Sequence, residues 1–187
     1  MLIAGVEWTS ETGEVLHRDP MWVKKIDKQG TIENLNWTHV YEALRQACNI
    51  TTGGYLWHEA VTFDPKSRQW YFLPRKASHQ RYHPVDDQTR GTNFLIVANE
   101  RLTEFKARRV GPLEPEYGFT TVKKVPGFDD LFIALKVREI VEDESDPSDA
   151  TTHSKLCVFD ASGNLYLENG AGFVHVSDHK FEGLEFL

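Results

Sequence analysis

Two charged side chains lie within or directly after strongly apolar stretches of this chain, where charge is unusual. Glu59 is flanked by Trp57 and Ala60, so its carboxylate interrupts a run of residues typical of a buried strand. A carboxylate in such a place can hold a metal ion or handle a proton, although the residues alone favour an ordinary strand carboxylate. Arg75 follows Pro74 just past an apolar run, and its planar fork suits a phosphate group better than a lysine does.

Other groups of residues carry weaker chemical signals. Lys76, Arg81 and Arg90 are further cations, but cations on loops mostly serve solvation. The histidines do not combine with Cys48 and Cys157 in the spacing of a zinc site. The sequence also lacks the glycine-rich phosphate loop Gly-x-x-x-x-Gly-Lys-Ser/Thr.

The composition excludes several classes of protein. Of the 187 residues, 21 are Lys or Arg and 28 are Asp or Glu, which gives a net charge of −7. This balance argues against a nucleic-acid partner, because proteins that bind the phosphate backbone concentrate cations. No apolar run approaches the roughly 18 residues that a membrane helix needs, and the first residues lack the features of a signal peptide. Two cysteines are too few for a disulfide framework; buried free thiols are expected, and a single bridge stays open.

Most of the chain has the pattern of short strands joined by turns. A hairpin is predicted at 54–63 and 69–73, because Pro65 favours the turn between them. A second hairpin is expected at 155–159 and 164–167, around a glycine-containing turn. Further strands are expected at 21–26, 92–98, 121–125 and 131–137.

Two segments depart from this pattern. Apolar residues at helical spacing, such as Val40 and Leu44, predict one amphipathic helix from Thr38 to Ala47 whose apolar face packs on the core. Residues 141–150 are acidic and poor in apolar side chains, which predicts a flexible, solvated loop between two strands. This loop lacks the central glycine and closing glutamate of an EF-hand, so calcium is not expected there.

The regular spacing of the strands predicts an all-β fold, which could be a sandwich, a barrel or a propeller. A propeller blade takes roughly 40–50 residues, so this chain would supply about three or four blades. That number is small for a closed propeller. The pattern of residues does not decide between these architectures.

Particular strings then point to a family. The chain resembles the calcium-activated nucleotidases, the soluble apyrases, nearly from end to end and in order, with the acidic loop as the long departure. The strings that carry the resemblance are EWTSETGEV (7–15), WVK (22–24), GYLWHE (54–59), WYFLPRKAS (70–78), RY (81–82), DD (86–87), GTN (91–93), GFTTVK (118–123), DLFIALK (130–136) and FEGLEFL (181–187).

The resemblance implies a five-bladed β-propeller of which residues 1–187 form the C-terminal part, here a partial propeller of about three blades with one short helix. It implies calcium-dependent hydrolysis of nucleoside diphosphates and triphosphates, such as UDP, GDP, ADP or ATP, to the lower nucleotide and phosphate. Family members act in the lumen of the secretory pathway or outside the cell, so that location is expected.

The resemblance also assigns residues to the site. Glu59, Thr120 and Glu182 match the family's calcium ligands, at intervals of 61 and 62 residues, which suits one ligand from each blade. The family usually has serine at the position of Thr120, and threonine keeps the hydroxyl and carbonyl oxygens. Arg75 matches the arginine of a Leu-Pro-Arg motif and is expected to contact phosphate, while Glu59 either ligates the ion or orients the attacking water.

Two other functions stay open. The chain could be a truncated, catalytically inactive protein that still binds calcium; an open propeller edge would then favour dimerisation, aggregation or instability. A glycan-binding or glycosidase propeller would instead use paired carboxylates such as Glu59 and Glu182.

Overall fold

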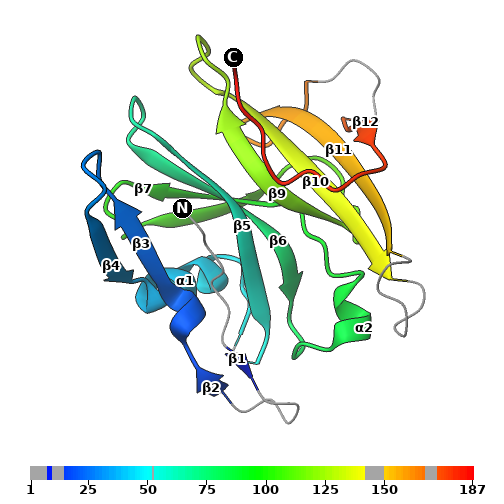
Figure 1. Cartoon of the computed structure of the whole chain (residues 1–187), viewed down its shortest axis with the longest axis horizontal. Helices are drawn as coiled ribbons and strands as arrows, with labels where there is room; N and C mark the ends of the chain where they lie inside the picture. The colour runs from blue at the N-terminus through cyan, green and yellow to red at the C-terminus, as the bar shows by residue number, and fades with distance from the viewer. Residues whose placement is uncertain (1–7, 10–14, 52, 142–149, 167–171) are drawn as a thin grey trace.

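The computed structural model describes residues 8–9, 15–51, 53–141, 150–166 and 172–187, and antiparallel strands dominate these parts (Figure 1). Within them, two sheets have four strands each, in the orders β5-β6-β7-β8 and β12-β11-β10-β9, and β1 pairs with β2 and β3 with β4. The elements are β1 (Trp8–Thr9), β2 (Val15–His17), η1 (Asp19–Met21), β3 (Trp22–Ile26), β4 (Ile32–Asn36), α1 (Thr38–Ala47), β5 (Tyr55–Asp64), β6 (Gln69–Ser78), α2 (Pro84–Asp87), β7 (Phe94–Asn99), β8 (Phe105–Arg109), β9 (Tyr117–Lys124), β10 (Leu131–Val141), β11 (Ala150–Asp160) and β12 (Val174–Ser177).

The first predicted hairpin is confirmed as β5 and β6, with a turn that the sequence specifies locally. The carboxylate of Asp64 accepts hydrogen bonds from the backbone N–H groups of Lys66 (3.1 Å) and Ser67 (3.2 Å), as expected for an aspartate that opens a turn. However, β6 continues well beyond residue 73 to Ser78. The expectation that Arg75 lies past the end of its strand is therefore wrong, because Arg75 lies inside β6.

The predicted helix is confirmed with its bounds, Thr38–Ala47. Its buried residues include Val40 and Leu44, which pack in one apolar cluster with Phe72 of β6. The Asn36 side chain accepts a hydrogen bond from the Thr38 N–H (3.0 Å), which helps the chain to enter the helix. Two further short helical segments, η1 and α2, accompany it.

The second predicted hairpin is confirmed at its turn and for a short return. Oδ1 of Asp160 accepts hydrogen bonds from the N–H groups of Ser162 and Asn164. The returning segment pairs through a bridge between Phe159 and Leu165 and a hydrogen bond from the Tyr166 N–H to the Val158 carbonyl (2.9 Å), and Leu167 lies outside the described residues. Strand β11 pairs with β10 along its whole length and with β12 on its other side. The pairing of β10 with β11 places the acidic segment between two hairpin strands, as predicted; residues 142–149 themselves lie outside the described residues.

The four other predicted strands are all present as β3, β7, β9 and β10, with ends that differ by several residues. Strands β4, β8 and β12 were not predicted. Each has only four or five residues, of which two are apolar, and so few apolar residues do not stand out as a strand in the sequence. Strands β8 and β12 end their sheets, where burial is smallest.

Two apolar clusters fill the interior of the described part. One packs α1 against the first sheet, and the other joins the two sheets through residues such as Phe119 and Phe132. Strand β9 contacts both β5 and β6, so the sheets meet along these strands (Figure 1). Cys48 lies in the first cluster and Cys157 in the second, and both are buried free thiols, as expected. No helix of the described residues has the length and apolar character needed to span a membrane.

Candidate functional site

The pairing of β5 with β6 is irregular at the two residues that the sequence singled out. His58 of β5 is paired with Pro74 of β6, but the next residue on each strand, Glu59 and Arg75, has no partner in the β5–β6 register. Each is therefore the extra residue of a bulge, and bulges redirect side chains. Pro74 has no N–H to give to the ladder, which suits it to such a place.

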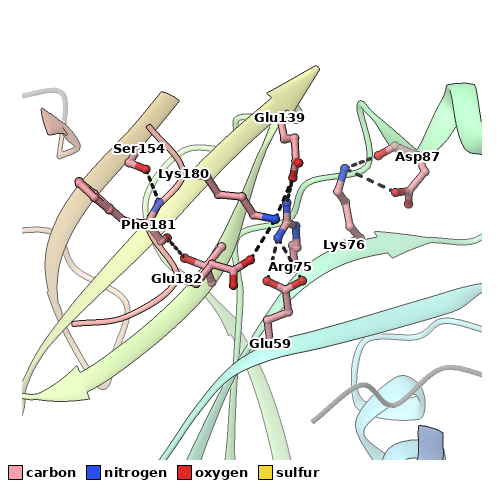
Figure 2. Close-up of polar contacts among 10 residues, drawn as sticks. Glu59, Arg75, Lys76, Asp87, Glu139, Ser154, Lys180, Phe181 and Glu182 are labelled. Carbon is pink, nitrogen blue, oxygen red and sulfur yellow. Dashed lines mark hydrogen bonds and ion pairs between the residues drawn. The ribbon is translucent and has the colours of Figure 1, made fainter. Parts of the chain in front are cut away.

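Both redirected side chains meet in an ion pair (Figure 2). Nη1 of Arg75 lies 2.8 Å and 3.0 Å from the two carboxylate oxygens of Glu59, and Nη2 donates to Glu139 Oε2 at 3.1 Å. The Arg75 side chain is only 10% exposed, against 26% for Glu59 and 36% for Glu139. A guanidinium can bridge two carboxylates in this way because its donors are fixed in a plane.

The network continues into the segment that follows β12. Lys180 Nζ lies 3.2 Å from Glu139 Oε2 and 2.9 Å from Glu182 Oε1. Their mutual hydrogen bond raises the pKa of Lys180 and lowers that of Glu182, so both groups stay charged. We call Glu59, Arg75, Glu139, Lys180 and Glu182 the charged network; its three carboxylates and two cations leave one net negative charge.

Hydrogen bonds from β9 and β11 hold this C-terminal segment in place. The Thr120 hydroxyl donates to the Phe181 carbonyl (3.0 Å), and the Phe181 N–H donates to the Ser154 hydroxyl (3.1 Å). Ser154 in turn donates to the carbonyl of His179 (2.6 Å). Figure 2 shows the segment fixed beside β10, so that Glu182 extends toward Arg75.

A glycine on β9 makes room for Arg75. A Cβ added to Gly118 would lie 2.4 Å from Cγ of Arg75 and 2.5 Å from its backbone oxygen. Such distances are well inside van der Waals contact. Any other residue here would push β9 away from Arg75, so Gly118 is part of the support of the site.

The structure thus brings together three of the four residues named from the sequence: Glu59, Arg75 and Glu182. Thr120 is buried and joins the site by fixing the backbone next to Glu182. Glu139 and Lys180 belong to the network but were not predicted. Glu139 lies on β10 between the predicted strand 131–137 and the acidic segment 141–150, so neither prediction included it.

The weaker cation candidates lie elsewhere. Lys76 is not a solvated loop residue as expected: it is buried, contacts the backbone carbonyl of Asp87, and lies 3.6 Å from the Asp87 carboxylate (Figure 2). Burial lowers the pKa of Lys76. Arg90 donates to the side chain of Gln80 (2.7 Å), away from the charged network.

The chemistry of the donors suits a hard divalent cation and an anionic substrate. Carboxylate, hydroxyl and carbonyl oxygens are the ligands that calcium prefers, and Glu59, Thr120 and Glu182 offer them around one region. The Glu59 carboxylate is paired with Arg75 and the Glu182 carboxylate with Lys180. The two carboxylates therefore already stabilise positive charge in this region. Arg75 adds the donor geometry that phosphate oxygens require.

Comparisons with known proteins agree with this chemistry. Over 98% of its length the chain is 38% identical to "Soluble calcium-activated nucleotidase 1" of Mus musculus, of which the match covers 43%. It is 35% identical to an apyrase of Cimex lectularius, with 98% of this chain and 48% of that protein covered. It is also 35% identical to apyrase apy-1 of Caenorhabditis elegans, with 97% and 49% covered. The chain therefore spans less than half the length of these relatives. The family model for apyrases matches residues 3–187, and the chain belongs to the apyrase family.

Proposed function

We propose that this chain carries part of the active site of a calcium-dependent nucleotidase, which hydrolyses nucleoside diphosphates and triphosphates to the lower nucleotide and phosphate. The observation that carries the proposal is the convergence of Glu59, Arg75, Glu139 and Glu182 in one network on an apyrase-family chain. A buried arginine among carboxylates offers both a contact for phosphate and ligands for a cation.

In this proposal Glu59, Thr120 and Glu182 hold the calcium ion through their oxygens. When bound, calcium offsets the negative charge that develops on the phosphate oxygens. Glu59 is now paired with Arg75 and Glu182 with Lys180, so a calcium ion held by these carboxylates would compete with both cations. Arg75 and Lys180 would then offer donors to the substrate's phosphates.

Arg75 and Glu59 act closest to the reaction. Arg75 contacts the terminal phosphate through its Nη atoms, while Glu59 orients the attacking water or ligates the ion. Glu139 keeps Arg75 in position through Nη2. The contact with Glu139 thus holds the guanidinium at the site before the substrate arrives, and such positioning lowers the barrier of the reaction.

The proposal extends to the fold and setting of the protein. We take the two four-stranded sheets as blades of a five-bladed propeller, with β3, β4 and α1 belonging to a third, and the chain as its C-terminal part. The name of one relative, "Soluble calcium-activated nucleotidase 1", supports the proposal of calcium and a nucleotide substrate. A location in the secretory pathway or outside the cell, and self-association of the chain, stay predictions.

The test is phosphate release from UDP, GDP, ADP and ATP by the purified chain, with calcium, with magnesium and with a calcium chelator. Calcium-dependent turnover should fall at least about 100-fold in Arg75→Lys, because lysine cannot bridge phosphate as the guanidinium does. Arg68→Lys is the matched control: Arg68 also pairs with a glutamate, Glu100, but at the exposed turn of the same hairpin, and it should keep full activity.

A second measurement separates the inactive alternative from the enzyme. Calcium binding is followed directly by calorimetry on the parent chain and on Glu59→Gln. Binding without turnover in a folded sample would support the inactive calcium-binding protein. A calcium affinity that is equal in both proteins would contradict the assignment of Glu59 as a ligand.

A further inference from the structure

A second group of chemically capable side chains lies on the edge of the β9–β12 sheet, and it shares no residue with the charged network. Asp178 Oδ1 lies 2.9 Å from Nδ1 of His153 and 3.3 Å from Nε2 of His175. One ligand atom from each residue falls within 4.8 Å of the other two. Of the described residues, these three form the compact group of histidine and carboxylate ligands.

The pairing of β11 with β12 explains why the three side chains share a face. His175 is opposite Lys155, and Ser177 is opposite Ser154, so Val176 is an extra residue in the ladder. In a regular strand, residues 175 and 178 would point to opposite faces. The bulge at Val176 shifts the alternation by one residue, which brings Asp178 to the same face as His175.

The backbone at the group is fixed by hydrogen bonds that do not use the three side chains. The Thr152 hydroxyl donates to the carbonyl of Asp178 (2.8 Å), and the Ser177 hydroxyl accepts from the N–H of His179 (3.1 Å). Two cations are register partners of the histidines, and each already has a carboxylate partner: Arg138, opposite His153, is paired with Glu116 at 2.8 Å, and Lys155, opposite His175, is paired with Glu114. A ligand would therefore meet a preformed arrangement.

We propose that His153, His175 and Asp178 form a binding site for a zinc-type divalent transition metal. Two imidazole nitrogens and one carboxylate oxygen are a donor set that zinc binds with water in the fourth position. In a tetrahedral zinc site with bonds of about 2.0–2.1 Å, neighbouring ligand atoms lie about 3.3 Å apart. The two distances to Asp178 Oδ1, 2.9 Å and 3.3 Å, are close to this value.

The donor chemistry separates this site from a calcium site. Calcium takes oxygen ligands and six or more of them, whereas imidazole selects zinc, copper or nickel. The site also has a structural consequence. Asp178 lies two residues before Lys180 and four before Glu182. A metal bound at Asp178 would therefore fix the segment that contributes Lys180 and Glu182 to the charged network.

The test is a zinc titration of the whole chain after removal of metals, in excess calcium so that oxygen sites are filled. One equivalent of zinc is expected to bind, and cobalt at the same site should give the visible absorption of tetrahedral coordination. His175→Ala should weaken zinc binding by at least about tenfold, since even loss of a residue that only supports a metal ligand costs this much.

His179→Ala is the matched control, because His179 lies in the same exposed segment but outside the ligand group. It should bind zinc like the parent chain. Asp178→Ala is the second variant and should also lose affinity. Equal zinc affinity in the parent and His175→Ala, or equal losses in His175→Ala and His179→Ala, would overturn the proposal and leave only surface ion pairs.

Discussion

Substitution of Gly118 by alanine tests the contact between β9 and β6 on which the position of Arg75 depends. The added methyl would lie 2.4 Å from Arg75 Cγ and 2.5 Å from the Arg75 carbonyl oxygen. Carbon atoms in ordinary contact are about 3.5–4.0 Å apart. The Arg75 side chain could rotate away, but its carbonyl belongs to the backbone of β6 and cannot.

The two strands must therefore separate by roughly 1 Å, a forced overpacking that costs about 1–3 kcal/mol of the free energy of unfolding. The same displacement moves the guanidinium away from Glu59 and Glu139. Because a misplacement of about 1 Å can lower a rate by about 100-fold, the turnover number should fall by one to two orders of magnitude.

Urea unfolding and phosphate release measure the two effects separately. Gly183→Ala is the stability control, because a Cβ there meets nothing within 4 Å and the backbone is not left-handed; it should unfold within about 0.5 kcal/mol of the parent. If Gly118→Ala unfolds like Gly183→Ala, the close approach of β9 to Arg75 is wrong. If it is destabilised but fully active, the position of Arg75 does not control turnover.

Three further predictions concern buried titratable groups. Burial lowers the pKa of His58 to about 3, so the folded chain keeps this imidazole neutral at pH 5. In the unfolded chain the imidazole takes up a proton below about pH 6.5. The free energy of unfolding should therefore fall by about 2 kcal/mol from about pH 7.5 to about pH 5. His58→Phe should remove this loss in urea titrations, and an unchanged pH dependence would contradict the assignment. Asp64→Asn should cost about 1.5–3 kcal/mol in the same assay, because Lys124 Nζ, 2.6 Å away, loses a charged acceptor. Burial raises the pKa of Cys48 and Cys157 to about 12, so neither thiol should react with a thiol reagent at neutral pH until the chain unfolds.

The elements that the sequence predicted correctly are those whose own residues determine them. The helix Thr38–Ala47 has apolar residues at helical spacing, and the β5–β6 turn has an aspartate that satisfies its backbone. Strands β8 and β12 have only two apolar residues each, too few to predict a strand, and they lie at the ends of their sheets and bury little. Their position follows from pairing with β7 and β11, which local composition does not encode.

The residues of the candidate site also fall into two groups, those that local sequence made noticeable and those that it did not. Glu59 was noticeable because charge is rare between apolar residues, and Arg75 because it follows an apolar strand. Glu139 and Lys180 were not noticeable, because neither belongs to a motif of the sequence and each gains its role from a contact made across the fold. Their distances in sequence from Arg75 are too large for spacing alone to reveal them.

Pro74 shows why the position of Arg75 was misjudged. A proline is usually found at the edge or end of a strand, because it cannot donate to the ladder, and the predicted strand ended before it, at Leu73. In the structure β7 pairs with β6 only over Gln69–Phe72, so β7 does not need the missing N–H at Pro74. On the other side of β6, Pro74 is paired with His58 of β5, and the register is irregular on both sides of this pair. Glu59 and Arg75 leave the register there and meet, so the proline that does not fit a regular strand lies at the irregularity that forms the site.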